Sequence, residues 1–396
     1  MQNLLIKSQK KINNVSTKFV RYLYKELNLK NRLSSILGAR GTGKTTLLLQ
    51  LAKKSTATKQ VLYVALDDLF FTNSTLYSLA EDFSKLGGEF LFLDEVHKYP
   101  NWSRELKLIY DDFENLQIIF TSSSILDIYK GESDLSRRAI KYNLKEMSFR
   151  EYLILYENIE LPKLSLSEII TNHSQIALQI TKQIRPIKYY QNYIKVGAYP
   201  YLKNNIDEYY QQVLNTINLI LDIDLQSIED VDYINIVKIK RLLYVLSTNV
   251  PFTPNVSKLS EKIGLHRNIL VKALQWLQKA ELINMLIKTN KSITTLSKPD
   301  KIWLHNTTLS YVLSSNNVNV GNMRETFFLQ HISVMHNISL PAKADFLVDN
   351  KYTFEIGGKN KVQKQIQNIN NAFIVKDDIE TGVMNIIPLW MFGFLY

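Results

Sequence analysis

The chain has 396 residues, of which 45% are hydrophobic and 21% charged, and its formal net charge is +11. This composition is ordinary for a folded protein and argues against a disordered one, and at about 100–200 residues per domain the length suggests roughly two to four domains. The sequence contains no cysteine, which excludes disulfide scaffolds, thiol nucleophiles and cysteine-ligated zinc. No apolar stretch reaches the roughly 20 residues that span a bilayer. We therefore expect a cytoplasmic protein without a membrane partner.

The positive charge is concentrated in two segments. Residues 234–301 hold twelve Lys and Arg against three Asp and Glu, a net charge of +9, and residues 1–34 carry a net charge of +7. The rest of the chain is therefore mildly acidic, with a net charge of −5. Two basic segments on an acidic body are typical of a protein with a polyanionic partner, although two solvated basic faces have the same composition.

The first third of the chain alternates apolar runs with amphipathic stretches. The runs predict strands over Leu33–Leu37, Val61–Leu66, Glu89–Leu93 and Leu116–Phe120. The stretches between them predict helices over Thr45–Lys54, Leu76–Leu86 and Ser103–Phe113. This alternation is typical of an α/β fold in which a parallel sheet has helices on both faces.

The remainder of the chain divides into three parts. From Ser148 to about Ile228, Leu, Ile and Tyr recur at three- and four-residue spacing, which predicts helices. The basic segment predicts helices over Ile236–Ser247, Val256–Ile263 and Arg267–Lys279, then a hairpin of Glu281–Lys288 and Ser292–Leu296. An α+β pattern closes the chain, with a helix over Glu325–Met335, paired strands Ala344–Val348 and Tyr352–Ile356, and a core strand in the apolar run Ile386–Tyr396.

A glycine-rich segment follows the first predicted strand and opens the first predicted helix. Its residues fit the pattern G-x-x-x-x-G-K-[ST] in full and are Gly38, Ala39, Arg40, Gly41, Thr42, Gly43, Lys44 and Thr45. In this pattern the glycines let backbone N–H groups surround phosphate oxygens, and the helix N-terminus favours their negative charge. We expect Lys44 to reach the β- and γ-phosphates, the Thr45 hydroxyl to bind Mg²⁺, and Thr46 to complete the nucleotide-binding residues.

The third predicted strand ends in two acidic residues, Asp94 and Glu95. We expect Asp94 to hold the metal through water and Glu95 to activate the attacking water as a general base. One additional strand lies between the phosphate-binding loop and this acidic pair. That order is more typical of hydrolytic NTPases than of simple kinases.

Polar residues after the fourth strand complete the expected site. The residues from Thr121 to Ser123 stand at the carboxyl end of a parallel strand, so they are candidates for sensing the γ-phosphate. Arg137 and Arg138 follow, and a guanidinium there would neutralise charge on the γ-phosphoryl group within one subunit or from a neighbour. A serine-rich turn and a surface arginine pair are the respective alternatives.

Segments along nearly the whole chain resemble those of bacterial and archaeal AAA-type ATPases that carry a C-terminal domain of unknown function. The similar segments are Gly38–Leu51, Phe92–Trp102, Phe120–Ser124, Leu135–Ala139, Met147–Leu153, Val196–Pro200 and Phe354–Lys361. The resemblance implies an AAA-like ATPase core, a helical lid, a winged helix and a C-terminal domain similar to restriction endonucleases. It also implies ATP as the nucleotide, and it favours Arg138 over Arg137 as the phosphate sensor because Arg137 stands where the family more often has glycine.

The basic segment is itself typical of a helix-turn-helix with a wing. Such a fold presents the N-terminal residues of its third helix to the DNA major groove, and those residues are His266, Arg267, Asn268 and Lys272. Candidates for salt-sensitive contacts with DNA phosphates are Lys258, Lys262 and Lys288. A winged helix that only packs between domains has the same charge, so binding of double-stranded DNA is one of two alternatives.

The C-terminal part contains Glu325, Asp345, Glu355 and Lys359. Restriction-endonuclease-type nucleases use an Asp, then a Glu and a Lys two positions apart on one strand, so that two carboxylates bind a divalent metal and the Lys steadies developing charge. Asp345 and Glu355 have suitable spacing for such a second metal site. Lys359, however, lies four positions after Glu355, ~13 Å along a strand at ~3.3 Å per residue, unless a glycine bulge draws it back. A catalytically silent nuclease-like fold is therefore the favoured interpretation.

Together these features predict a multidomain ATPase. Its parts are a P-loop ATPase core with the basic N-terminal segment (1–150), a helical lid (151–233), a winged helix (234–313) and a nuclease-like α+β domain (314–396). The predicted activity is Mg²⁺-dependent hydrolysis of ATP with Lys44, Glu95 and Arg138 as catalytic residues, coupled to DNA or to a protein partner. Both a single subunit and an oligomer are compatible with these features. Two alternatives stay open, a nucleotide-gated DNA-binding switch with little turnover and an ATP-licensed metal-dependent nuclease.

Overall fold

The computed structural model describes residues 1–122, 135, 137–202, 205–225, 232–248, 253–288, 299–314, 318–361 and 366–396. The chain forms two units, one of Met1–Lys145 with Asp224–Glu229 and the other of Glu146–Ile223 with Asp230–Tyr396. The four-part division expected from the sequence stays a prediction. Among the helices that the structure describes, none combines the length and the apolar character that crossing a membrane requires.

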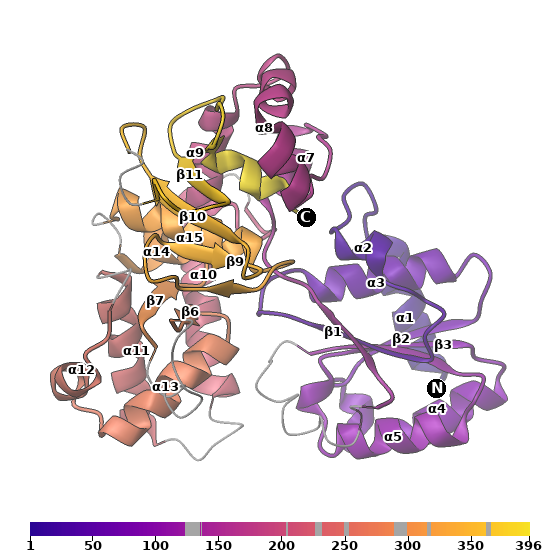
Figure 1. Ribbon diagram of the computed structural model, residues 1–396. Helices are drawn as coiled ribbons and strands as arrows, with labels where there is room; N and C mark the ends of the chain where they lie inside the picture. The colour runs from indigo at the N-terminus through magenta and orange to yellow at the C-terminus, as the bar shows by residue number, and fades with distance from the viewer. Residues whose placement is uncertain are drawn as a thin grey trace. The chain divides into compact units, whose positions relative to one another are not determined.

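A five-stranded sheet forms the centre of the first unit (Figure 1). Its strands are β1 (Leu33–Leu37), β2 (Val61–Ala65), β3 (Phe90–Asp94), β4 (Gln117–Thr121) and β5 (Ile140–Asn143), in the spatial order β2-β3-β4-β1-β5. All four pairings are parallel. The prediction of an α/β fold with a parallel sheet is therefore confirmed for this unit, and the predicted strands lie within one residue of their observed bounds.

Helices cover both faces of this sheet. In Figure 1, α3 (Lys44–Ser55) lies above the sheet, and α4 (Leu76–Lys85) and α5 (Trp102–Asp112) lie below it. Because both faces are covered, the inner strand β3 is a continuous apolar run up to Asp94, and all five of its residues are buried. A capping box between Thr75 and Ser78 fixes the start of α4. The three helices predicted for this region are confirmed.

The first helix packs against an edge of the sheet. The buried residues of α1 (Gln2–Asn14) are Leu4, Ser8 and Ile12, which recur every four residues and so lie on one face of the helix. The hydroxyl of Ser8 accepts a hydrogen bond of 2.8 Å from the backbone N–H of Tyr63 on the edge strand β2. This contact gives a partner to a backbone donor that an edge strand otherwise leaves unpaired.

The second unit begins with helices, as the spacing of its apolar residues predicts. They are α7 (Phe149–Glu157), α8 (Leu166–Thr181), α9 (Pro186–Val196) and α10 (Ile206–Leu219), and a π-helical turn, η3 (Ile220–Asp224), extends α10 to Asp224 of the first unit. Three further helices follow at α11 (Tyr233–Ser247), α12 (Val256–Ile263) and α13 (Arg267–Lys279). All three agree with the predicted ranges to within three residues.

A short antiparallel pair follows these helices. β6 (Ile283–Leu286) pairs with β7 (Lys301–Leu304). The predicted second strand of the hairpin, Ser292–Leu296, lies outside the described residues. The strand that pairs with β6 was not predicted, because its four residues are too few to show an alternating pattern.

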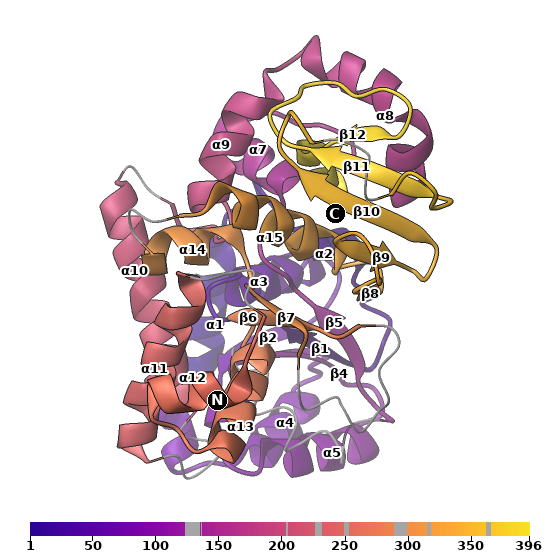
Figure 2. The ribbon, with the colours of Figure 1, turned by 60° about the vertical axis from the view of Figure 1, so that its left-hand side comes forward.

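A second five-stranded sheet, in the order β12-β11-β10-β9-β8, forms the C-terminal part together with α14 (Thr307–Ser314) and α15 (Val320–Ile332) (Figure 2). β8 (Ile338–Ser339), β9 (Phe346–Val348) and β10 (Tyr352–Gly357) pair antiparallel, whereas β11 (Ala372–Lys376) and β12 (Ile386–Pro388) join in parallel. The predicted hairpin is confirmed. Asp349 and Asn350, the central residues of the turn that the hydrogen bond from Lys351 N–H to Val348 oxygen closes, both have positive φ, which Asp and Asn adopt more readily than most residues.

Two expectations for this part were wrong in their extent. The apolar run Ile386–Tyr396 is a strand only as far as Pro388, and Leu389–Phe394 form the 3₁₀ helix η6. All of η6 is buried, so its side chains show neither a strand nor a helix period. α15 begins at Val320, five residues before Glu325, because the Asn319 side chain caps it by accepting hydrogen bonds from Gly321 and Asn322.

Candidate functional site

The glycine-rich loop joins β1 to α3 at the carboxyl edge of the first sheet. Gly38 has a φ of +149°, and a Cβ at this position would lie 2.2 Å from the backbone oxygen of Leu144, so only glycine fits there. Gly43 adopts a left-handed conformation with a φ of +94° and precedes the first residue of α3. The loop therefore leads directly into a helix N-terminus, whose first N–H groups lack partners within the helix and favour anions.

Buried hydrogen bonds hold the loop in this conformation. The guanidinium of Arg21 donates to the carbonyl oxygen of Thr42 and, at 2.7 Å, to that of Lys145. The Thr42 hydroxyl donates to the carbonyl oxygen of Ala39 at 2.9 Å. Arg21 is only 4% exposed, so these bonds are shielded from water. The loop is thus fixed to the chain segment that follows β5.

Two basic side chains of the loop have different partners. The ammonium group of Lys44 donates to the carbonyl oxygens of Gly38 and Ala39 at 2.9 and 2.7 Å, and the residue is buried. The guanidinium of Arg40 pairs with the carboxylate of Asp224 through two contacts of 2.9 and 3.3 Å. Burial raises the pKa of Asp224, and the charge of Arg40 offsets only part of this effect. The structure thus keeps Lys44 in the loop and directs Arg40 to an acidic residue outside it.

Asp94 lies at the end of β3 between two hydroxyl groups. One carboxylate oxygen accepts a hydrogen bond of 2.8 Å from Tyr63 on β2, and the other accepts one from Thr121 on β4. Asp94 is only 4% exposed. Burial and the charge of Asp94 raise the pKa of Tyr63 far above its ordinary value, so the phenol stays a hydrogen-bond donor. The arrangement fixes the direction of the Asp94 carboxylate.

Glu95 adopts a left-handed backbone conformation with a φ of +52°, and its N–H donates to the Thr121 hydroxyl at 3.1 Å. Its carboxylate lies 2.6 Å from the ammonium group of Lys98, in the short helical turn η2 (Val96–Lys98). Burial alone would raise the pKa of Glu95, but the hydrogen bond and charge of Lys98 outweigh it and hold this pKa below its ordinary value. Glu95 is therefore ionised at neutral pH and already has a cationic partner.

A histidine that the sequence did not single out adjoins these groups. His97 Nδ1 lies 3.0 Å from the Ser122 hydroxyl at the end of β4. Burial lowers the pKa of His97 to about 4, and the charges of Arg40 and Lys44 act in the same direction while that of Glu95 opposes them. The imidazole is therefore neutral at pH 7. These mutual effects also show that the loop and the end of β3 share one electrostatic environment.

The remaining residues expected in the site lie in different surroundings. Arg138 forms a two-contact ion pair with Asp111 of α5, at 2.9 and 3.0 Å, and Arg137 is exposed. Thr45 and Thr46 are exposed in the first turn of α3. Ser123 lies outside the described residues. The structure therefore keeps Lys44 within the loop and places Asp94 in contact with Thr121. It gives Arg138 a partner on α5.

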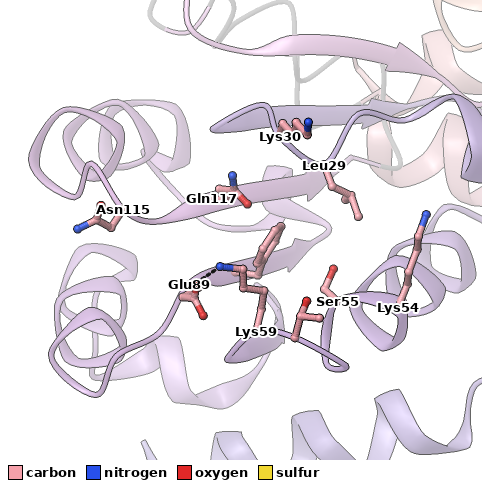
Figure 3. Close-up of a pocket in the computed structure, with 10 residues that line it drawn as sticks. Leu29, Lys30, Lys54, Ser55, Lys59, Glu89, Asn115 and Gln117 are labelled. Atoms are coloured by element: carbon pink, nitrogen blue, oxygen red, sulfur yellow. Dashed lines mark hydrogen bonds and ion pairs between the residues drawn. The ribbon is translucent and has the colours of Figure 1, made fainter.

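The opposite edge of the sheet contains a pocket of about 600 Å³ (Figure 3). It lies where β3 and β4 begin and α3 ends, and the ion pair between Lys59 and Glu89 lies in it. Helix C-termini carry partial negative charge, and ligands of open parallel sheets bind at the carboxyl edge. This pocket is therefore not the expected nucleotide site.

The acidic residues of the C-terminal part do come together in the second unit. Glu325 accepts a hydrogen bond of 3.0 Å from the indole of Trp303 and lies 3.5 Å from the ammonium of Lys301, which is 3.9 Å from Asp345. Burial raises the pKa of Glu325, and the charge of Asp345 adds to this effect. Burial also raises the pKa of Glu355, on which the charge of Asp345 acts as well. The three carboxylates thus lie within electrostatic reach of one another.

The lysine that joins this cluster is not the expected one. Glu355 forms an ion pair with Lys361, whereas Lys359 is exposed. β10 ends at Gly357, and a turn closed by the hydrogen bond from Lys361 N–H to Gly358 oxygen, 2.9 Å long, brings the chain back. The sequence-based distance between Glu355 and Lys359 assumed one continuous strand. This assumption does not hold beyond Gly357, where β10 ends.

The residues predicted to contact DNA lie on α12 and α13. Lys258 and Lys262 are on α12, His266 is the N-cap of α13, and the other three are in the first two turns of α13. All six are exposed, and they are Lys258, Lys262, His266, Arg267, Asn268 and Lys272. Their exposure satisfies one requirement for a nucleic-acid surface.

Two family models match separate parts of the chain. Residues 30–153 match a model described as an AAA domain (AAA_14), and residues 187–319 match one described as a domain of unknown function (DUF8612). The first match contains the glycine-rich loop, β3 and β4. This part of the chain is an AAA-type P-loop domain.

The chain is similar to two curated relatives and to several solved structures. Two relatives from Methanocaldococcus jannaschii, both named uncharacterized proteins, are MJ1637 (28% identical over 69% of this chain and 61% of the relative) and MJ1544 (22% identical over 92% and 89%). The matched region thus spans about three fifths of the first relative. Similar solved structures include the Walker-type ATPase paby2304 of Pyrococcus abyssi (TM-score 0.41, 11% identity, 79% of this chain and 95% of that one). Another is AMPPCP-bound DnaA from Aquifex aeolicus (TM-score 0.26, 16% identity, 65% and 84%).

Proposed function

We propose that the AAA-type domain binds ATP and hydrolyses it in the presence of Mg²⁺. The observation that carries this proposal is the pairing of a complete phosphate-binding loop with an acidic pair whose two members have different partners. Lys44 is held in the loop by two carbonyl oxygens, Asp94 is oriented by two hydroxyls, and Glu95 is ionised next to Lys98. These are the groups that phosphoryl transfer to water needs.

The residues present suit Mg²⁺, which prefers hard oxygen ligands. Thr45 and Asp94 would hold the ion, which would neutralise charge on the phosphate oxygens. The hydroxyls of Tyr63 and Thr121 support this role, because they are neutral donors that hold the Asp94 carboxylate in one orientation.

The chain's own side chains would divide the work of hydrolysis. The Lys44 ammonium exchanges its carbonyl partners for phosphate oxygens, and the loop N–H groups stabilise the charge that develops there. Glu95 orients the attacking water and accepts its proton, which requires its carboxylate to separate from Lys98. Thr121, Ser123 and Arg138 are proposed to sense the γ-phosphate, and Arg138 must then leave Asp111 or act on a neighbouring subunit.

The test compares nucleotide binding with turnover in single variants. We expect Lys44→Ala to weaken MgATP binding measured by calorimetry by at least tenfold, because the loop loses its cation. We expect Glu95→Gln to bind MgATP within threefold of the wild type and to hydrolyse it at least a hundredfold more slowly. Equal hydrolysis by the wild type and Glu95→Gln would contradict the proposed base. A wild type that binds MgATP without turnover, with or without DNA, would favour the nucleotide-gated switch.

We propose further that α11–α13 with β6 and β7 act as a winged helix that couples the ATPase to double-stranded DNA, a protein partner being the alternative. The exposure of the six polar and basic residues on α12 and α13 supports this, as does the net charge of +9 in residues 234–301. A variant with Arg267→Gln and Lys272→Gln should bind a duplex at least tenfold more weakly and with a smaller slope of log K against log salt. Duplex affinity that does not depend on salt, or that this variant retains, would contradict DNA coupling.

A second activity, metal-dependent cleavage of nucleic acid, is favoured by the cluster of Glu325, Asp345, Glu355 and Lys361. Two carboxylates and a lysine within reach are the groups such nucleases use, and the turn after Gly357 supplies the lysine that the spacing of Lys359 does not. Asp345 and Glu355 would hold the metal. We expect plasmid nicking with Mn²⁺ or Mg²⁺ that Asp345→Ala and Lys361→Ala abolish and Lys359→Ala leaves intact. Absence of nicking by the wild type, or nicking that survives Asp345→Ala, would exclude this activity.

A further inference from the structure

A hollow of about 540 Å³ lies beside the phosphate-binding loop. Thr45 of α3 and Tyr63 of β2 line it, and these are the expected metal ligand and the hydroxyl partner of Asp94. The other lining residues are Leu49, Asn14, Val15 and three lysines, Lys7, Lys10 and Lys11. We name these three lysines the lysine stripe. The hollow therefore combines a cluster of positive charge with two residues of the nucleotide site.

The fold holds the lysine stripe in this place. Because the four-residue spacing of Leu4, Ser8 and Ile12 directs those residues toward the sheet, the stripe lies on the neighbouring face of α1. The bond from Tyr63 N–H to Ser8 fixes the middle of α1, and Lys53 of α3 donates to the carbonyl oxygens of Asn13 and Val15 at 3.0 and 2.8 Å. The helix is thus attached to both β2 and α3, the two elements that carry the other lining residues.

The positive charge of the stripe is only partly compensated by the protein. Lys7 forms an ion pair of 2.9 Å with Asp68, and the ammonium of Lys11 lies 5.1 Å from the centre of the Tyr63 ring. Lys10 has no acidic partner among the residues that the structure describes. Like charges three and four residues apart weaken a helix. A bound anion would relieve this repulsion, and its position would be next to Thr45.

We propose, on the basis of the ATP site above, that this hollow binds a phosphate group and that Lys10 and Lys11 are its ligands. Ammonium groups bind phosphate as point charges, and the two lysines are adjacent in sequence and line the same hollow. The phosphate comes either from the nucleotide, as the inorganic product that leaves the neighbouring loop, or from the backbone of a nucleic acid. Both sources offer the same oxygens, so the test has one arm for each.

The first arm measures binding of inorganic phosphate to the full chain by calorimetry, with MgADP present. We expect the Lys10→Gln/Lys11→Gln variant to bind phosphate at least tenfold more weakly than the wild type and to bind MgADP within threefold. The matched control is Lys30→Gln/Lys54→Gln, which removes two lysines from the pocket at the opposite edge of the sheet (Figure 3). This control should bind phosphate within twofold of the wild type. Circular dichroism of each variant verifies that the overall helix content is that of the wild type.

The second arm replaces inorganic phosphate by a 20-base-pair duplex. If the wild type ignores inorganic phosphate but the Lys10→Gln/Lys11→Gln variant loses at least tenfold in duplex affinity, the nucleic-acid backbone is the source. Wild-type affinity of this variant for both probes, or an equal loss in the control, would overturn the proposal. A wild type that binds no MgADP would contradict the proposed ATP site and not the phosphate site. In that case both arms are repeated without nucleotide, and they still decide whether the lysine stripe binds phosphate.

Discussion

Two acidic residues that follow each other in the sequence have different kinds of partner at the end of β3. Asp94 receives hydrogen bonds from the hydroxyls of Tyr63 and Thr121, whereas Glu95 forms an ion pair with Lys98. Neutral donors orient a carboxylate and leave its charge for a metal. An ammonium partner neutralises the carboxylate and must be displaced before it can accept a proton. The difference in partners thus agrees with the different roles proposed for the two residues.

Tyr63 is a positioning residue in this arrangement, since it acts on the metal through Asp94. A hydrogen bond to a charged group contributes roughly 1.5–3 kcal/mol. Tyr63→Phe should therefore leave Asp94 with one hydroxyl partner and a less fixed orientation. We expect the Mg²⁺ concentration for half-maximal ATPase activity to rise at least threefold while the variant still folds.

The matched control for this substitution is Tyr77→Phe. The Tyr77 hydroxyl also donates to an aspartate, Asp112, at 2.8 Å, but on the exposed surface of α4 and α5. This control should keep the wild-type Mg²⁺ dependence. An unchanged Mg²⁺ dependence in Tyr63→Phe, or the same shift in both variants, would show that the Tyr63 bond does not position the metal ligand.

Single elements show which part of the fold the sequence could predict. β3 was found because a parallel strand covered on both faces is a continuous apolar run, and all five of its residues are buried. β5 is not predicted by the sequence, because it is an edge strand whose four residues are all at least partly exposed and so form no apolar run. The apolar pattern of Leu389–Phe394 predicts a strand and not the 3₁₀ helix η6, because complete burial removes any period from its side chains. Prediction thus succeeded where burial produces a pattern.

The same limit applies to the site. The loop and the acidic pair are contiguous in sequence, so their residues were found from the motif alone. Tyr63 was not, because its place beside Asp94 depends on the pairing of β2 with β3. Lys361 was missed for a local reason, since the expectation assumed that β10 continues beyond Gly357. Contacts between strands and the course of turns depend on the folded chain. They cannot be deduced from the spacing of residues within one strand.

At the scale of the whole molecule, each unit contains a histidine that folding keeps neutral. His97 in the first unit and His331 in the second both have a pKa that burial lowers to about 4. His331 is fully buried, with Nδ1 2.9 Å from the Phe327 oxygen and Nε2 3.0 Å from the Tyr193 hydroxyl. Because an unfolded histidine has a pKa of about 6.5, the unfolded chain binds more protons between pH 6.5 and 4. The contribution of these two histidines to the free energy of unfolding is therefore full above pH 6.5 and declines as the pH falls toward 4.

The His331→Gln variant tests this for the second unit. Between pH 7 and pH 5, protonation of His331 in the unfolded chain should lower the free energy of unfolding by about 2 kcal/mol, and the variant should lack this loss. The measurement is urea unfolding followed by tryptophan fluorescence in a Trp102→Phe background, because the other tryptophans, Trp276, Trp303 and Trp390, all lie in the second unit. The exposed His266, changed to Gln, is the control and should keep the wild-type dependence on pH. All three proteins have the same carboxylates. The difference in the pH dependence of their unfolding free energies therefore reports the substituted histidine. An equally steep loss in His331→Gln and the wild type would mean that protonation of His331 does not set the acid stability of this unit.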